Sequence, residues 1–274
     1  MKRWITVVMF SIMVALVFSI ADATAKDDKL ATQIDDSVKA SREEFGSEAY
    51  LFPGWLIDLS AGYSLSRGNS DKSDFLARAA VIKKFEETWE LIAKGEYAWG
   101  EVKDQDTGEY DKTADRGLIS AQGNLFVIDN GFLYGRSEES YDKIKKLDRR
   151  LDNGIGAGYD LYRDEDSYTA VEAGFSYIDS KYEDGQRDHG VYLRLAQNGA
   201  LVINEQVTLL ESVEYKPKLK DFNDYLINAE ASIRVGLFSQ IYFMFSVTDR
   251  YDNTPAAGTK RNDLSLITSL GVSI

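Results

Sequence analysis

Apolar and polar residues alternate along the last eleven residues of the chain, LSLITSLGVSI. In an extended strand, Leu264, Leu266, Leu270, Val272 and Ile274 lie on one face, and small or polar residues lie on the other. A soluble protein rarely ends on an apolar strand whose edge is unpaired, whereas a barrel pairs its last strand with its first. The pattern therefore predicts that the final strand closes a β-barrel.

The same alternation recurs in GWLIDLSAGYSLS (54–66), SYTAVEAGFSY (167–177) and DYLINAEASIRVGL (224–237). These segments are longer than the usual strand of about five or six residues. A tilted membrane-crossing strand needs that length, with apolar residues outward and polar residues inward. We predict strands near 54–66, 73–85, 88–102, 113–127, 131–142, 149–162, 166–180, 188–198, 203–215, 223–237, 240–251 and 261–274.

The connections between these segments alternate between short and long. Tight links are expected at 86–87, 129–130, 163–165, 199–202 and 238–239, and the other links are longer and more polar. Short turns at one end and longer loops at the other are typical of outer-membrane barrels. The predicted fold class is an all-β, transmembrane, antiparallel up-and-down barrel of about twelve strands. An even strand number places both termini in the periplasm.

The first 25 residues have the three parts of a secretory signal peptide. Lys2 and Arg3 provide a positive start, 5–20 are mostly apolar, and Ala-Thr-Ala at 23–25 is a small-residue cleavage site. The alternative is an uncleaved membrane-anchoring helix, because the apolar stretch is close to the length that spans a bilayer. Cleavage after residue 25 is the prediction favoured by the site.

Residues 26–52 have a different pattern. Leu30, Ile34 and Val38 follow a helical spacing, although so short and charged a helix is marginal by itself. We expect a periplasmic segment that is helical or disordered, with a plug inside the barrel as the alternative. The barrel itself is expected over 53–274.

Composition removes several classes of function. The chain has no Cys, which excludes disulfides, thiolate metal sites and a Cys nucleophile. The formal net charge is −13, and an acidic chain does not suit nucleic acid. We expect no cofactor and no bound metal. The expected partners are outer-membrane lipid and lipopolysaccharide, the barrel-assembly machinery and small solutes.

Two stretches also resemble a known family. GWLIDLSAGYSLSRGNSD and DRRLDNGIGAGYDLYRDEDSYTAVEAGFSY are similar to the salt-induced outer membrane protein family, and the resemblance covers 53–274. It implies an outer-membrane barrel, linked to salt stress, whose biochemical role is undefined, and it carries over no catalytic or binding residue. Ile274 departs from the aromatic residue that usually ends such barrels.

Few residues suggest catalysis. His189 is the only histidine, and it lies beside Asp188 and near Ser180, so a hydrolase at the barrel rim is one alternative function. No nucleophile motif accompanies it, and we predict that the protein is not an enzyme. The alternating glycines 154, 156 and 158 lack the spacing of a dinucleotide fingerprint and are expected to leave space or allow curvature. The acidic loop DQDTGEYD lacks the residue order of an EF-hand.

The most informative polar residues are charges that the alternation directs into the barrel. The predicted lumen-facing set is Asp58, Arg78, Lys84, Glu90, Lys94, Glu96, Arg116, Asp160, Glu172, Arg194, Glu214, Glu230 and Arg234. Their near balance of sign fits a lumen cross-linked by ion pairs, or a hydrated pore with selective charges. The sequence thus favours a narrow solute channel or a structural envelope component. A secreted soluble β-protein or surface-recognition module, with its apolar faces buried against each other, is a further alternative.

Overall fold

The computed structural model describes residues 55–66, 71–85, 88–104, 107–164, 167–238, 240–256 and 258–274. The predicted signal peptide (1–25) and periplasmic segment (26–52) lie outside the described residues.

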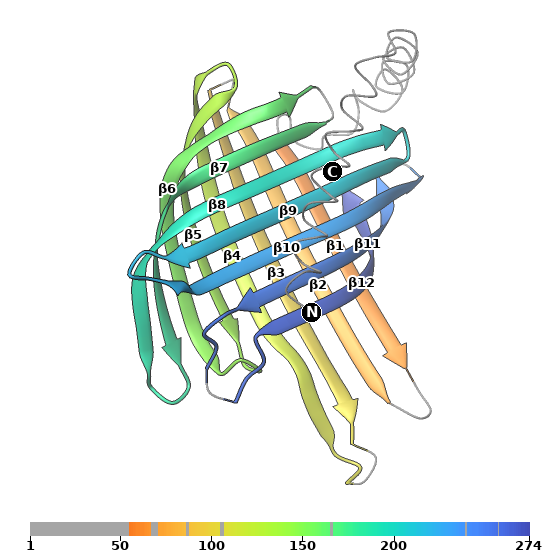
Figure 1. Cartoon of the computed structure of the whole chain (residues 1–274). Helices are drawn as coiled ribbons and strands as arrows, with labels where there is room; N and C mark the ends of the chain where they lie inside the picture. The colour runs from red at the N-terminus through yellow and green to blue at the C-terminus, as the bar shows by residue number, and fades with distance from the viewer. Residues whose placement is uncertain are drawn as a thin grey trace. The chain divides into compact units, whose positions relative to one another are not determined.

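Twelve antiparallel strands form a closed barrel in which sequence neighbours pair and β1 also pairs with β12 (Figure 1). The strands are β1 (Trp55–Ser66), β2 (Lys72–Phe85), β3 (Trp89–Lys103), β4 (Tyr110–Ile128), β5 (Gly131–Asp142), β6 (Leu147–Arg163), β7 (Tyr168–Tyr182), β8 (Arg187–Asn204), β9 (Val207–Lys218), β10 (Asp221–Phe238), β11 (Ile241–Asp252) and β12 (Asn262–Ser273). Closure places Asp58 opposite Ser273 and Ala61 opposite Leu270. In the part of the chain that the structure describes, the first and last strands are paired with each other, and the predicted fold class is confirmed.

One predicted turn is wrong. The sequence places a link at 199–202, whereas β8 continues through this stretch and ends at Asn204. Gly199 stays in the ladder, opposite Thr169 of β7 and Glu211 of β9. The turn follows at Asn204, whose side-chain oxygen accepts hydrogen bonds from the backbone N–H groups of Gln206 and Val207. An asparagine that bonds the next residues' backbone in this way stabilises a tight turn.

The apolar side chains lie on the outer face of the barrel. Leu59 of β1, Ile155 of β6 and Leu266 of β12 are 44%, 71% and 68% exposed. Such exposure is unfavourable in water and favourable in hydrocarbon, so the outer face is that of a membrane-spanning barrel. The soluble alternative, in which these faces are buried against each other, is wrong. No described segment forms a helix long and apolar enough to cross a membrane.

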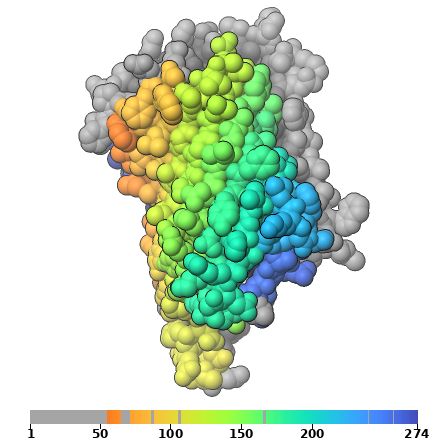
Figure 2. All heavy atoms as spheres, turned by 90° about the vertical axis from the view of Figure 1, so that its left-hand side faces the viewer, coloured from red at the N-terminus to blue at the C-terminus, as the bar shows by residue number. Residues whose placement is uncertain are grey.

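Aromatic residues mark the end of the barrel where the short turns lie. Trp55, Phe85 and Trp89, on adjacent strands, are exposed, and the Lys83 amine lies 5.1 Å from the centre of the Trp55 ring. Aromatic rings with a nearby cation suit the interface between hydrocarbon and water. At the opposite end, the hairpin of β3 and β4 projects beyond the neighbouring strands (Figures 1 and 2).

Glu211 is an exception on the outer face. It lies opposite Ala231 of β10 with no change of register around it, so it shares the outward side of β9 with Leu209 and Val213. The carboxylate instead accepts a hydrogen bond of 2.5 Å from the Gln197 amide, over the space left by Gly199. The side chain is buried, which shields this polar group from lipid.

Candidate lumen site

The structure places the thirteen predicted lumen residues on the inner face of the wall, opposite the exposed apolar side chains. Paired residues of neighbouring strands share a face. Arg78 is paired with both Ser60 and Glu96, and Glu214 with both Ala196 and Asn228. The inner-face residues are Asp58, Arg78, Lys84, Glu90, Lys94, Glu96, Arg116, Asp160, Glu172, Arg194, Glu214, Glu230 and Arg234.

A first group of inner-face charges, here the Glu96 cluster, consists of Arg78, Glu96, Arg116, Glu230 and Arg250. Glu96 lies 2.6 Å from Arg250, 3.1 Å from Arg78 and 3.7 Å from Arg116. Arg78 also donates two hydrogen bonds to Glu230, of 2.7 and 3.1 Å. Because Arg78 is on β2 and Glu230 on β10, these side chains bridge strands that are not neighbours. The cluster therefore narrows the lumen at this level.

A second group, here the Glu214 cluster, lies against β5 to β9. The Glu214 carboxylate forms ion pairs with Arg194 at 2.5 Å, Lys216 at 2.7 Å and Arg136 at 3.0 Å. Lys216 also lies 2.7 Å from Asp152. Arg194 completes the group by an ion pair of 2.5 Å to Glu172. The three cations around Glu214 offset the cost of removing its charge from water.

Smaller groups lie toward the end with the short turns. Arg234 donates a hydrogen bond of 2.7 Å to Asp58, and its guanidinium lies 4.1 Å from the centre of the Tyr242 ring. On the other side of the barrel, Arg163 binds both oxygens of Asp160. These contacts hold inner-face carboxylates in place near the mouth.

The two clusters differ in their access to solvent. The side chains of Arg194 and Glu172 are each 6% exposed, and that of Lys216 is 3% exposed. In the Glu96 cluster, Glu230 is 34% and Arg250 25% exposed. Solvent inside the barrel therefore reaches the part of the wall formed by β2, β3, β10 and β11 more than the part formed by β6 to β9.

Sequence reasoning missed several members of these clusters, notably Arg136, Asp152, Lys216 and Arg250. On β5 the signal was present, because Tyr134, Arg136 and Glu138 alternate with the outward residues, but small and polar outward residues hide the contrast. The predicted ninth strand ends at residue 215, whereas β9 runs to Lys218 and so includes Lys216. Arg136, Asp152 and Arg250 lie inside predicted strands on the inward side of the alternation, and Lys216 lies just beyond the end of one.

The structure does not bring together the residues that the hydrolase alternative requires. His189 lies on the outer face of β8, opposite Asp179, with its ring centre 6.4 Å from that of Tyr177. Ser180 and Asp188 lie on the inner face, where Ser180 bonds Arg150 and Asp188 bonds Lys218. The wall of the barrel thus separates His189 from the two residues proposed to work with it.

The glycines of β6 serve packing. A Cβ on Gly158 would meet the ring of Phe132, and one on Gly156 would meet the hydroxyl of Tyr134, so aromatic side chains of β5 lie flat against the wall. The space expected at these glycines is filled. In the described part of the acidic loop, the Asp104 carboxylate accepts a hydrogen bond from the Thr107 backbone N–H. Among the described residues, no group of three acidic or histidine side chains could hold a metal ion.

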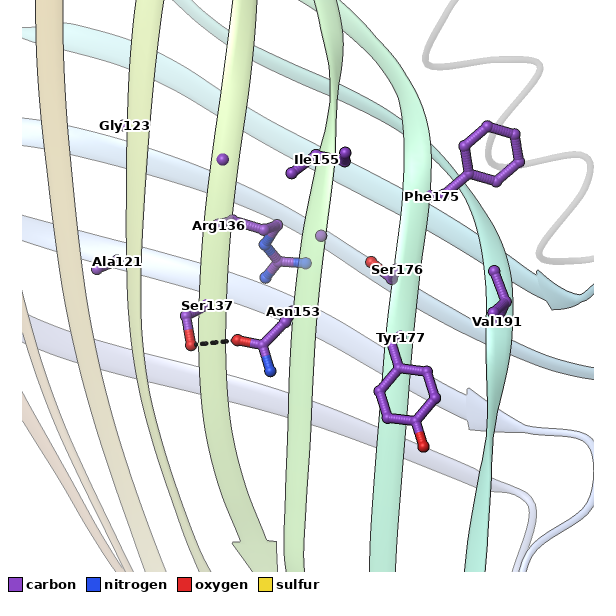
Figure 3. A pocket seen from close by; sticks show the side chains of 12 residues that line it. Ala121, Gly123, Arg136, Ser137, Asn153, Ile155, Phe175, Ser176, Tyr177 and Val191 are labelled. Atoms are coloured by element: carbon purple, nitrogen blue, oxygen red, sulfur yellow. Dashed lines mark hydrogen bonds between the residues drawn. The ribbon is translucent and has the colours of Figure 1, made fainter.

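A cavity of about 620 Å³ opens on the outer face, over β4 to β8. Gly123 and Gly135 are among the residues that line it. Ile155, Phe175 and Tyr177 also line it, from the neighbouring strands β6 and β7 (Figure 3). Ser137 donates a hydrogen bond of 2.8 Å to Asn153 at its edge (Figure 3). Small residues in the apolar band, such as Gly123 and Gly135, create this hollow, which faces the membrane.

A closed antiparallel barrel with an apolar outer face and a charged inner face defines the class of outer-membrane β-barrels. Within that class, the chain belongs to the family described as "Protein of unknown function, DUF481", which matches residues 59–274. The description of this family and the names of the similar solved structures make no mention of induction by salt, so the finer resemblance to the salt-induced family is not shown.

Solved structures share the fold at low sequence identity. An outer membrane channel from Pseudomonas putida F1 is 10% identical with a TM-score of 0.50, covering 84% of this chain and 98% of that one. The NanC porin is 9% identical with a TM-score of 0.45, covering 80% and 97%. The translocator domain of the autotransporter NalP from Neisseria meningitidis is 11% identical with a TM-score of 0.43, covering 89% and 96%. No curated protein matches the chain.

Proposed function

We propose that this protein is a narrow outer-membrane channel for small hydrophilic solutes and is not an enzyme. The observation that carries the proposal is the inner wall, on which charged side chains are held in place while Lys94 remains exposed to solvent. A fixed array of charges around solvent is the arrangement by which pores select solutes.

The contacts within the lumen limit the size of the solute. Arg78 to Glu230 joins β2 to β10, and Arg136 to Glu214 joins β5 to β9, so both clusters extend from the wall into the lumen. A barrel of this strand number lies between small barrels filled by side chains and open porins. Small ions and metabolites are therefore the proposed solutes.

The arrangement of polar residues supports a role without catalysis. The wall separates His189 from Ser180 and Asp188, and the inner-face carboxylates are mostly engaged by arginine or lysine. A carboxylate paired with several cations is held ionised and is poorly suited to accept a proton.

We propose that both termini lie in the periplasm, since the start of β1 and the end of β12 share the end of the barrel with the short turns. The proposed surroundings are outer-membrane lipid and lipopolysaccharide, with insertion by the barrel-assembly machinery and no role for nucleic acid. The resemblance to the salt-induced family adds the proposal that the channel acts in the envelope under salt stress.

Reconstitution tests the function directly. Purified, folded protein is added to planar lipid bilayers in KCl, and the same preparation after heat denaturation serves as the control. Discrete conductance steps from the folded sample alone are expected. The absence of steps from protein shown to be folded by its shift on unheated gels would overturn the channel.

The dense Glu214 cluster favours a second candidate, a structural envelope component whose lumen is closed by ion pairs. In that case the folded protein inserts into bilayers without conducting, and its deletion weakens the envelope. The two candidates thus give opposite results in the bilayer experiment.

A further inference from the structure

Lys94 differs from the other charged residues of the inner wall. Of the thirteen predicted lumen residues, all but Lys84 and Lys94 make a hydrogen bond or ion pair with another described side chain. Lys84 lies near the short-turn end of β2, whereas Lys94 lies further along β3, near the level of both clusters. Lys94 is therefore the residue of the two that a solute meets beside the charge clusters of the lumen.

The neighbours of Lys94 in the wall leave its side chain free to extend into the lumen. Its partners in the ladder are Ala80 of β2 and Ser120 of β4, both short. The Lys94 side chain is exposed to solvent, in contrast to the buried Arg194 and Glu172. An ammonium group that reaches solvent inside a barrel is accessible to any solute that passes.

Charges from both clusters act on this ammonium group. Glu230 and Glu172 attract it, and Arg136 and Arg194 repel it. Each of the two carboxylates already has an arginine partner, because Glu230 binds Arg78 and Glu172 binds Arg194. The positive charge of Lys94 is therefore not neutralised by a carboxylate of its own.

We propose that Lys94 is an anion-binding position in the lumen and that small monovalent anions, such as carboxylates and halides, are the solutes it selects. The ammonium group offers three hydrogen-bond donors and no acceptor, so it replaces part of the hydration of an anion and not of a cation. Surrounding protein weakens dielectric screening, which strengthens the attraction compared with an exposed lysine. This inference rests on the proposed channel function and names the solute class of that channel.

Reversal potentials in a KCl gradient test the proposal in the intact protein. Lys94→Glu is expected to lower the chloride-to-potassium permeability ratio severalfold, Lys94→Gln to lower it less, and Lys94→Arg to retain it. Lys112→Gln is the matched control, since Lys112 is exposed and pairs with Asp115 at the loop end of β4. An unchanged ratio in Lys94→Glu, or an equal shift in Lys112→Gln, would overturn the inference while leaving the channel intact.

A binding measurement extends the test to protein that does not conduct. Lysine amines are converted to ¹³C-dimethylamines, the signal of Lys94 is assigned by its loss in Lys94→Gln, and formate is titrated in at constant ionic strength. A saturable shift of this signal, and not of the Lys112 signal, is expected. A shift that is absent or grows linearly with formate would show that no anion site exists. If the wild-type protein binds formate but does not conduct, the proposed channel function is wrong and the anion site at Lys94 stands.

Discussion

Lys145, in the turn between β5 and β6, forms an ion pair of 2.8 Å with Asp263 at the start of β12. These strands lie on opposite sides of the ring of strands, so the turn reaches across the loop end of the barrel. Arg150 of β6 and Asp252 of β11 make a second, longer contact of 3.6 Å below it. The β5–β6 turn thus covers part of one mouth of the lumen.

Loss of this contact should open the mouth. Partly exposed ion pairs contribute up to about 1 kcal/mol, or about fivefold in an equilibrium. We expect Lys145→Gln to raise the open probability in bilayers by no more than about that factor. Exchanging the charges, with Lys145→Asp and Asp263→Lys together, should restore the wild-type value. Lys143→Gln is the control, because Lys143 pairs on its own side with Asp148 and Glu183. Equal gating in all variants would contradict a role for the turn as a cover.

The Glu214 cluster should be essential for stability. Glu214→Gln removes the carboxylate that Arg194, Lys216 and Arg136 share within a buried site, and breaking such a buried pair costs about 3–5 kcal/mol. Urea unfolding followed by tryptophan fluorescence should show the loss. Glu139→Gln, which breaks an exposed pair with Arg149, should cost less than about 1 kcal/mol. Similar losses in the two variants would show that the cluster contributes no more than a surface pair.

Gly158→Ala tests the packing of β5 on β6. The new methyl group would overlap the Phe132 ring, and overpacking of this kind costs about 1–3 kcal/mol. Adding Phe132→Leu should recover part of the loss. Gly123→Ala is the control because the space around its added Cβ is open. If both single variants unfold at the same urea concentration as wild type, the aromatic ring does not depend on the glycine.

Solvent inside the barrel can be mapped by thiol labelling, because the chain has no Cys. Lys94→Cys should react with a charged methanethiosulfonate in the folded protein. Ser176→Cys, also on the inner face but 1% exposed, should react only after unfolding. Protection of both positions would show that the lumen is closed at the level of Lys94.

At the loop end, Asp148 should titrate below the ordinary range of an aspartate. Hydrogen bonds from Lys181 and then Lys143 lower the pKa of this exposed carboxyl. A depressed pKa means that the contribution to stability is present above the unfolded-state pKa and is lost as the pH falls through the folded-state pKa. NMR titration of the carboxyl carbon measures the midpoint, which Lys181→Gln should raise. A midpoint that does not move would exclude Lys181 as the main cause.

The sequence by itself determined the barrel. The period of two in segments such as 54–66 and 224–237 depends on local backbone geometry alone, and it distinguishes the lipid-facing from the inner residues. Where outward residues are small or polar, as on β5, the contrast is too weak to assign a face. Gly199 suggested a turn because glycine is common in turns, although here it provides the space that Glu211 fills.

Only the tertiary structure decided which charges meet. Arg78 and Glu230 are separated by 152 residues, and Arg234 and Asp58 by 176. Their contact depends on the curvature of the wall and on the length of each side chain, and neither quantity is encoded in the alternation along one strand. The same holds for Lys94, whose free position follows from the short residues beside it on two other strands. The alternation along a strand determines which face of the wall a side chain lies on, whereas closure of the barrel determines which charged side chain it contacts.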